Sequence, residues 1–79
     1  MTWLVYVLEC SDATLYTGVT NDLDRRLKLH ESGKGARYTR GRAPFVVRYV
    51  EKGLSRSKAL SREYAIKALP RDKKRALFR

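Results

Sequence analysis

The six apolar residues from Trp3 to Leu8 constrain the fold of this 79-residue chain more than any other segment. The run is rich in β-branched and aromatic side chains and ends at Glu9, just before a Ser-Asp pair, which is typical of a strand followed by a turn. Apolar side chains fall on both faces of such a strand, so we expect residues 3–9 to lie in the middle of a sheet. The run is too short to cross a membrane or to form the core of a secretion signal.

The rest of the chain alternates between short strand-like and helix-like segments. The elements expected after the first strand are a turn at 10–13, a return strand at 14–19, a helix from about 22 to 32 capped by Asn21 and ended by Gly33, a strand from Phe45 to Glu51, a helix to about Leu69 and a short helix in 71–79 docked through Leu77 and Phe78. We therefore predict one α/β domain over 1–79, with a small, mostly antiparallel three-stranded sheet flanked by helices.

The charge balance points to a polyanionic partner. Eighteen Lys and Arg residues against eight Asp and Glu residues give a formal net charge of +10, and such a field attracts nucleic acid. The alternative is a protein whose basic surface only keeps it in solution. The single cysteine, Cys10, cannot form an internal disulfide, and no zinc-finger spacing is present. We expect a cytoplasmic location and no membrane association.

Two tyrosines should meet across the first hairpin. A turn at 10–13 would bring Tyr6 and Tyr16 together, and Gly18 would leave the sheet surface bare beside a helix N-terminus, where a phosphate can approach closely. The alternative is a pair of ordinary strand tyrosines beside a bulge glycine.

Three further side chains do not fit a plain core, although the alternatives are a solvated Arg26, a satisfied surface His30 and a Glu63 paired with an arginine at the core edge. Arg26 and His30 are four residues apart and so are neighbours on one helix surface at the edge of the core. Glu63 shares a helix face with three apolar residues, Ala59, Leu60 and Ile66. A carboxylate on such a face is costly unless it is paired or holds a metal. Magnesium needs few protein ligands, because it keeps waters and takes phosphate oxygens.

A basic, glycine-containing loop at 33–43 is the expected nucleic-acid contact. Its candidate binding residues are Lys34, Arg37, Tyr38, Arg40 and Arg42. The cations would follow the phosphate backbone and Tyr38 would stack on a base. Nothing in the loop suggests base readout, so weak sequence preference is expected. The alternative is a mobile, solvated loop.

Together these residues resemble the GIY-YIG nuclease superfamily over about Leu4 to Leu69. The two family tripeptides appear as Leu-Val-Tyr at 4–6 and Tyr-Thr-Gly at 16–18, and the helix arginine, the following histidine and the late glutamate fall on Arg26, His30 and Glu63. The chain is most similar to the small stand-alone bacterial YhbQ-like group. It departs from the motif at its first glycine, here Leu4, and at the middle isoleucine, here Thr17.

The resemblance implies a metal-dependent endonuclease that hydrolyses phosphodiester bonds of DNA in repair or processing, on branched, nicked or single-stranded forms. Glu63 would bind Mg²⁺ or Mn²⁺, and Arg26 would neutralise the phosphate. Tyr6 is the favoured base, helped by a pKa that Arg26 and the net charge would lower, with Tyr16 positioning water or phosphate. His30 is the rival base.

Two other functions remain open at this stage. One is a non-catalytic module that binds DNA or RNA with the same fold, and the other is a structural component of a ribonucleoprotein particle. DNA is favoured over RNA as the partner. A homodimer or a partner protein is physically reasonable for so small a domain.

Overall fold

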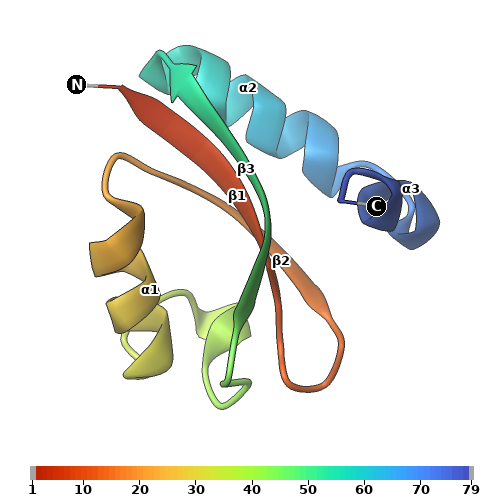
Figure 1. Cartoon of the computed structure of the whole chain (residues 1–79). Helices are drawn as coiled ribbons and strands as arrows, with labels where there is room; N and C mark the ends of the chain where they lie inside the picture. The colour runs from red at the N-terminus through yellow and green to blue at the C-terminus, as the bar shows by residue number, and fades with distance from the viewer. Residues whose placement is uncertain (1, 79) are drawn as a thin grey trace.

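The computed structural model describes residues 2–78. Its elements are β1 (Trp3–Glu9), β2 (Leu15–Thr20), α1 (Leu23–Glu31), a short 3-10 helix η1 (Arg37–Thr39), β3 (Val46–Leu54), α2 (Arg56–Lys67) and α3 (Arg71–Ala76). Figure 1 shows the strands between two layers, with α1 and η1 on one side and α2 and α3 on the other. The predicted strand-strand-helix-strand-helix-helix order is confirmed.

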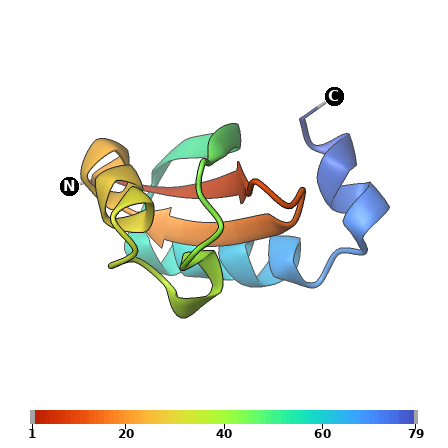
Figure 2. The ribbon, with the colours of Figure 1, turned by 90° about the horizontal axis from the view of Figure 1, so that it is seen from below.

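The sheet has the order β2-β1-β3, and both pairings are antiparallel. The first strand is therefore central, as its two apolar faces predict. Figure 2 shows β1 and β2 side by side and running in opposite directions, with α2 beyond them. In this register Tyr6 lies opposite Gly18 and Leu8 lies opposite Tyr16. Because β2 is an outer strand, its other edge is free of strand partners among the described residues.

Alternation along β1 divides the molecule into two halves. Val5 and Val7 form the core with Ile66 of α2, and Leu77 and Phe78 pack against this core as predicted. Tyr6 lies on the opposite face of β1, the face that meets His30 of α1. The sheet thus separates an apolar core from a polar, aromatic cluster.

Some element ends differ from the prediction. The cap of α1 is Asp22, whose side chain accepts the Arg25 backbone N–H, rather than Asn21. An acidic cap is favoured there by the helix dipole as well as by the hydrogen bond. The third strand starts at Val46 and continues to Leu54, so the sheet extends almost to the Ser55 cap of α2.

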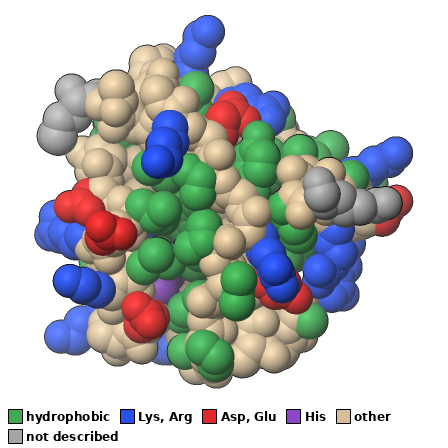
Figure 3. All heavy atoms as spheres, viewed as in Figure 1, with side chains coloured by type: hydrophobic (Ala, Val, Ile, Leu, Met, Phe, Trp, Pro, Cys, Tyr) green, Lys and Arg blue, Asp and Glu red, His purple; other side chains and the backbone are tan. Residues whose placement is uncertain are grey.

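The surface is unevenly divided between apolar and basic side chains. In Figure 3 hydrophobic side chains gather near the middle of the face, between α1 and the strands, and Lys and Arg side chains stand at the rim and at isolated points on the face. Leu60, expected to face inward, is instead 43% exposed. No helix within residues 2–78 has the length and apolar character needed to cross a membrane.

Candidate active site

Tyr6 and His30 form a buried hydrogen bond at the centre of the polar face. The Tyr6 hydroxyl lies 2.9 Å from His30 Nε2, and the two residues are 0% and 1% exposed. Strand β1 carries the tyrosine and α1 carries the histidine, and Leu23 and Leu27 of α1 are half-buried while His30 is fully buried. Two residues that the sequence left as rival bases are therefore bonded to each other.

Thr39 of η1 determines which way this hydrogen bond runs. Its Oγ1 lies 2.7 Å from His30 Nδ1 and donates its only proton to the Ala36 carbonyl at 2.9 Å. A hydroxyl that has given its proton away can only accept from the imidazole, so Nδ1 carries the hydrogen. In the neutral ring Nε2 is then an acceptor, and Tyr6 donates its phenolic proton to His30.

Two glycines allow this cluster to close. A Cβ on Gly18 would lie 2.5 Å from the Tyr6 hydroxyl and 2.6 Å from the adjoining ring carbon, and a Cβ on Gly35 would clash with His30 Nδ1. Glycine is therefore required by close packing at both positions. The expectation that Gly18 leaves a bare backbone patch for a phosphate is wrong, because the Tyr6 side chain covers it.

The pKa values of the pair move away from neutrality. Burial raises the pKa of Tyr6 to about 12, although the adjacent Arg26 guanidinium acts in the opposite direction. The predicted lowering of this pKa is wrong, because loss of hydration outweighs the nearby cation. Burial, and secondarily Arg26, lowers the pKa of His30 below its ordinary value. At neutral pH both groups are uncharged.

Aromatic rings extend the cluster towards the surface. The half-buried Tyr16 ring lies 6.3 Å from that of Tyr6, 5.3 Å from that of His30 and 5.9 Å from that of Tyr38, which it meets in a stacked orientation. Tyr38 is 43% exposed. The two motif tyrosines are thus neighbours, as the hairpin predicts, and a loop tyrosine joins them.

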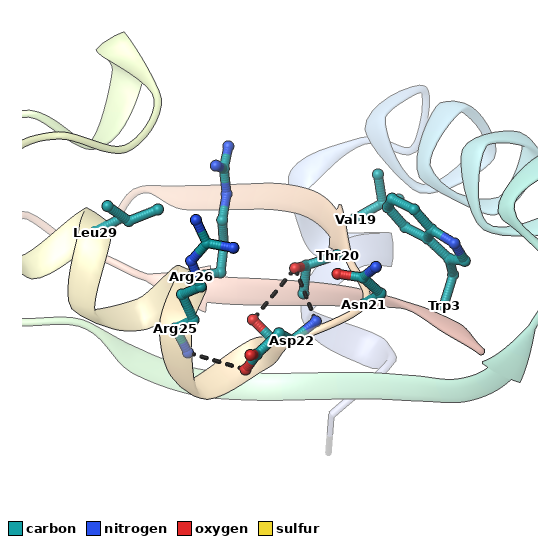
Figure 4. A pocket seen from close by; sticks show the side chains of 8 residues that line it. All are labelled: Trp3, Val19, Thr20, Asn21, Asp22, Arg25, Arg26 and Leu29. Atoms are coloured by element: carbon teal, nitrogen blue, oxygen red, sulfur yellow. Dashed lines mark hydrogen bonds between the residues drawn. The ribbon is translucent and has the colours of Figure 1, made fainter. Parts of the chain in front are cut away.

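Arg26 brings a cation with unused hydrogen-bonding capacity to the cluster. Its Nε is buried and has no partner within the described residues. Buried donors are normally paired, and an unpaired one points to an absent acceptor. Arg26 also lines a cavity of about 330 Å³ with Arg25 of α1 on the same side and with Trp3 and Val19 opposite (Figure 4). A phosphate oxygen is an acceptor that suits this guanidinium.

Glu63 reaches the cluster from α2. Its negative charge makes a minor contribution to the raised Tyr6 pKa, and Nζ of its neighbour Lys67 lies 6.0 Å from the centre of the Tyr16 ring. Glu63 forms an ion pair with Lys67 Nζ at 3.3 Å, and its side chain is 21% exposed. No group of three or more His, Cys, Asp or Glu side chains able to hold a metal occurs within residues 2–78. A lone carboxylate such as that of Glu63 is enough in principle for Mg²⁺, which keeps most of its waters.

The basic loop is more ordered than predicted. It contains η1. Arg42 forms an ion pair with Asp12, and its guanidinium lies 4.6 Å from the centre of the Tyr38 ring. Lys34, Arg37 and Arg40 are exposed. Thr39 and Tyr38 of the loop therefore contact the cluster directly, and the exposed cations of the loop lie beside it.

Two residues of this site were not found from the sequence. Thr39 sits among the loop cations, between Tyr38 and Arg40, and no spacing or pattern distinguishes it there. Lys67, whose Nζ lies 6.0 Å from the centre of the Tyr16 ring, follows Glu63 by one helical turn, a spacing that predicts the ion pair.

Comparisons with known proteins agree with this arrangement. Residues 2–76 match the GIY-YIG catalytic domain. The chain is 58% identical to UPF0213 protein OB0043 of Oceanobacillus iheyensis over 94% of its own length and 86% of the relative's. It is similar to the solution NMR structure of UPF0213 protein BH0048 from Bacillus halodurans, with 51% identity and a TM-score of 0.62 over 98% of this chain and 82% of that one. A second NMR structure, of protein EF2693 from E. faecalis, gives 41% identity and a TM-score of 0.68 over 96% and 81%. The chain therefore belongs to the GIY-YIG family, within the small group that contains the UPF0213 proteins.

Proposed function

We propose that this protein is a metal-dependent endonuclease that hydrolyses phosphodiester bonds of DNA. The observation that carries the proposal is the buried Tyr6–His30–Thr39 hydrogen-bond chain beside an arginine whose Nε lacks an acceptor. Ordinary strand tyrosines need no oriented histidine, and a buried guanidinium N–H is normally paired. The +10 charge supplies attraction to the polyanionic substrate.

Tyr6 and His30 act together as the base in this proposal. A phenol with a pKa of about 12 does not hold a phenolate at neutral pH. It can take a proton from water only as its own proton passes to His30 Nε2, which leaves Nδ1–H bonded to Thr39. Because the Tyr6 side chain has no exposed surface, the water must arrive with the substrate. The half-buried Tyr16 ring is the neighbour that has to yield.

Arg26 and Glu63 take the charged part of the reaction. The Arg26 guanidinium would pair with the scissile phosphate, and its unpaired Nε supports this role by offering an unused donor. Glu63 would hold Mg²⁺ or Mn²⁺ once Lys67 releases it, which is feasible because half of the Lys67 side chain is exposed. Such an ion supplies stabilisation of negative charge on the phosphate and on the leaving oxygen.

The second candidate is a non-catalytic DNA- or RNA-binding module. The Glu63–Lys67 ion pair favours it, because a paired glutamate needs no metal. It leaves the Tyr6–His30 bond without a purpose, so we place it second. Branched, nicked and single-stranded DNA remain the substrates to test first, with repair or processing as the biological setting.

A cleavage assay separates the two candidates. End-labelled linear, nicked, branched and single-stranded DNA, and RNA, would be incubated with the pure protein in Mg²⁺, in Mn²⁺ or in chelator. We expect metal-dependent cleavage that Glu63→Ala and Tyr6→Phe abolish while binding persists. Binding without cleavage on any substrate would leave the binding module as the function. Cleavage that survives both Glu63→Ala and Tyr6→Phe unchanged would mean that a contaminating enzyme is being measured.

A further inference from the structure

Two hollows open beside the outer strand β2, one near each of its ends. The first is the cavity of about 330 Å³ lined by Val19 and Thr20 at the end of the strand. The second, of about 230 Å³, is lined by Leu15, Tyr16 and Thr17 at its beginning. The four residue steps from Tyr16 to Thr20 correspond to about 13 Å of strand. Arg26 lines the first hollow and Tyr16 lines the second, so residues of the candidate site reach both.

The first cavity has an apolar, aromatic side and a cationic side, as a nucleotide-binding site has. Figure 4 shows Trp3 and Val19 on one side and the α1 arginines on the other. The Trp3 indole offers a flat apolar surface, and the Arg56 guanidinium lies 5.6 Å from its ring centre. Arg26 holds the buried, unpartnered Nε. The volume is near the lower limit of small-ligand pockets, about 300 Å³, and so suits a single base rather than a paired one.

The second hollow continues the positive charge away from the cluster. Lys67 and Lys74 line it together with Tyr38, and an adjoining hollow of about 210 Å³ adds Arg71 to Tyr38 and Lys74. Phosphates leaving the Arg26 position along β2 would therefore meet cations from α2 and α3. A groove that combines aromatic rings with backbone cations is how proteins hold single strands.

We propose that the cavity between Trp3 and Arg26 binds one unpaired nucleobase, and that the strand carrying it runs along the free edge of β2 towards Lys74. This inference rests on the proposed function for placing the phosphate at Arg26. A base inside a duplex is stacked on both faces and cannot also lie against Trp3. The site therefore favours single strands, or unpaired nucleotides within branched and nicked forms.

Trp3 is the one tryptophan of the chain, so tryptophan fluorescence and the indole N–H resonance both report on this cavity. The Glu63→Ala variant, in which cleavage is prevented, would be titrated with unpaired oligothymidylate, with the matching oligoribonucleotide and with a DNA hairpin of the same charge whose loop is a non-nucleotide linker. We expect either single strand to quench the fluorescence and shift the indole signal, with the hairpin stem leaving both unchanged. The DNA and RNA arms show whether the sugar matters.

Variants test the contact independently of the optical signal. Trp3→Ala should weaken single-strand binding about 5- to 150-fold, the effect of losing one stacked base. Trp3→Phe keeps an aromatic ring and should retain most of the binding, which shows that a loss in Trp3→Ala is not caused by misfolding. Tyr64→Ala is the matched control, because Tyr64 is 79% exposed on α2 and lines neither hollow. Equal quenching by the hairpin, or unchanged binding by folded Trp3→Ala, would overturn the inference. Cleavage by the wild-type protein without any tryptophan response would contradict the nucleobase site and leave the proposed nuclease function unaffected. A tryptophan response without cleavage would contradict the nuclease function instead.

Discussion

Replacing Thr39 with valine should disconnect the proton path without changing the shape of the site. The substitution keeps the branched side chain and removes the hydroxyl that lies 2.7 Å from His30 Nδ1. A buried N–H left without an acceptor costs about 1–3 kcal/mol. The imidazole can avoid this cost by moving its hydrogen to Nε2. Tyr6 must then accept rather than donate, and its own proton has nowhere to go.

Loss of this path should lower the rate of cleavage about 10²- to 10⁴-fold, the usual contribution of a positioned general base. The assay is single-turnover cleavage of the best substrate. Nitrogen-15 chemical shifts of the one imidazole report its tautomer in the same samples. Thr39→Ser is the matched control, because it keeps the hydroxyl and should retain both the tautomer and most of the rate.

Two results would refute this reasoning. The first is a wild-type imidazole that carries its hydrogen on Nε2, because Tyr6 could not then be the donor. The second is a folded Thr39→Val protein in which the tautomer changes and the rate of cleavage does not. Either would separate the hydrogen-bond chain from the chemistry.

Three further perturbations test the surroundings of the pair. Gly18→Ala should lower the free energy of unfolding by about 1–3 kcal/mol in urea titrations, because the new methyl overlaps the Tyr6 hydroxyl; an unchanged midpoint would contradict this packing. The pKa of Tyr6 is about 12 in the folded protein and about 10 in the unfolded chain. The free energy of unfolding should therefore keep its full Tyr6 contribution below pH 10 and fall by up to about 2.7 kcal/mol as the pH approaches 12. Tyr6→Phe should lack this part of the decrease at alkaline pH. Lys67→Met should free Glu63 and lower the Mg²⁺ concentration that gives half-maximal cleavage; a higher requirement would place Lys67 on the substrate instead.

Much of the fold could be predicted because local pattern and tertiary structure agree. The Trp3–Glu9 strand matches its predicted bounds, since its two apolar faces suit only a central position. Ser55 caps α2 through its side chain, as its place before the helix suggests. The ends of β3 were missed because long-range pairing with β1 extends the strand to Leu54, beyond the local apolar run.

The candidate site was only partly accessible from the sequence. Spacing along a hairpin and a helix brings Tyr6, Tyr16 and His30 together, because those distances are fixed by regular backbone geometry. The place of Thr39 depends on how the loop folds back over α1, which no local pattern encodes. The covering of Gly18 depends on the exact strand register, which sets Tyr6 opposite it. The sign of the Tyr6 pKa change was wrong for the same reason, since burial is a property of the assembled fold.

The most direct test of the proposed nuclease is the single-turnover cleavage rate at saturating Mg²⁺ for wild-type protein and Glu63→Gln. The amide preserves the size of the side chain and removes the negative charge that would hold the ion. We expect the variant to bind the same DNA and to cleave it at least 100-fold more slowly, in line with loss of a metal that stabilises the transition state. Equal rates from two equally folded proteins would contradict a metal site at Glu63 and, with it, the mechanism proposed for this family member.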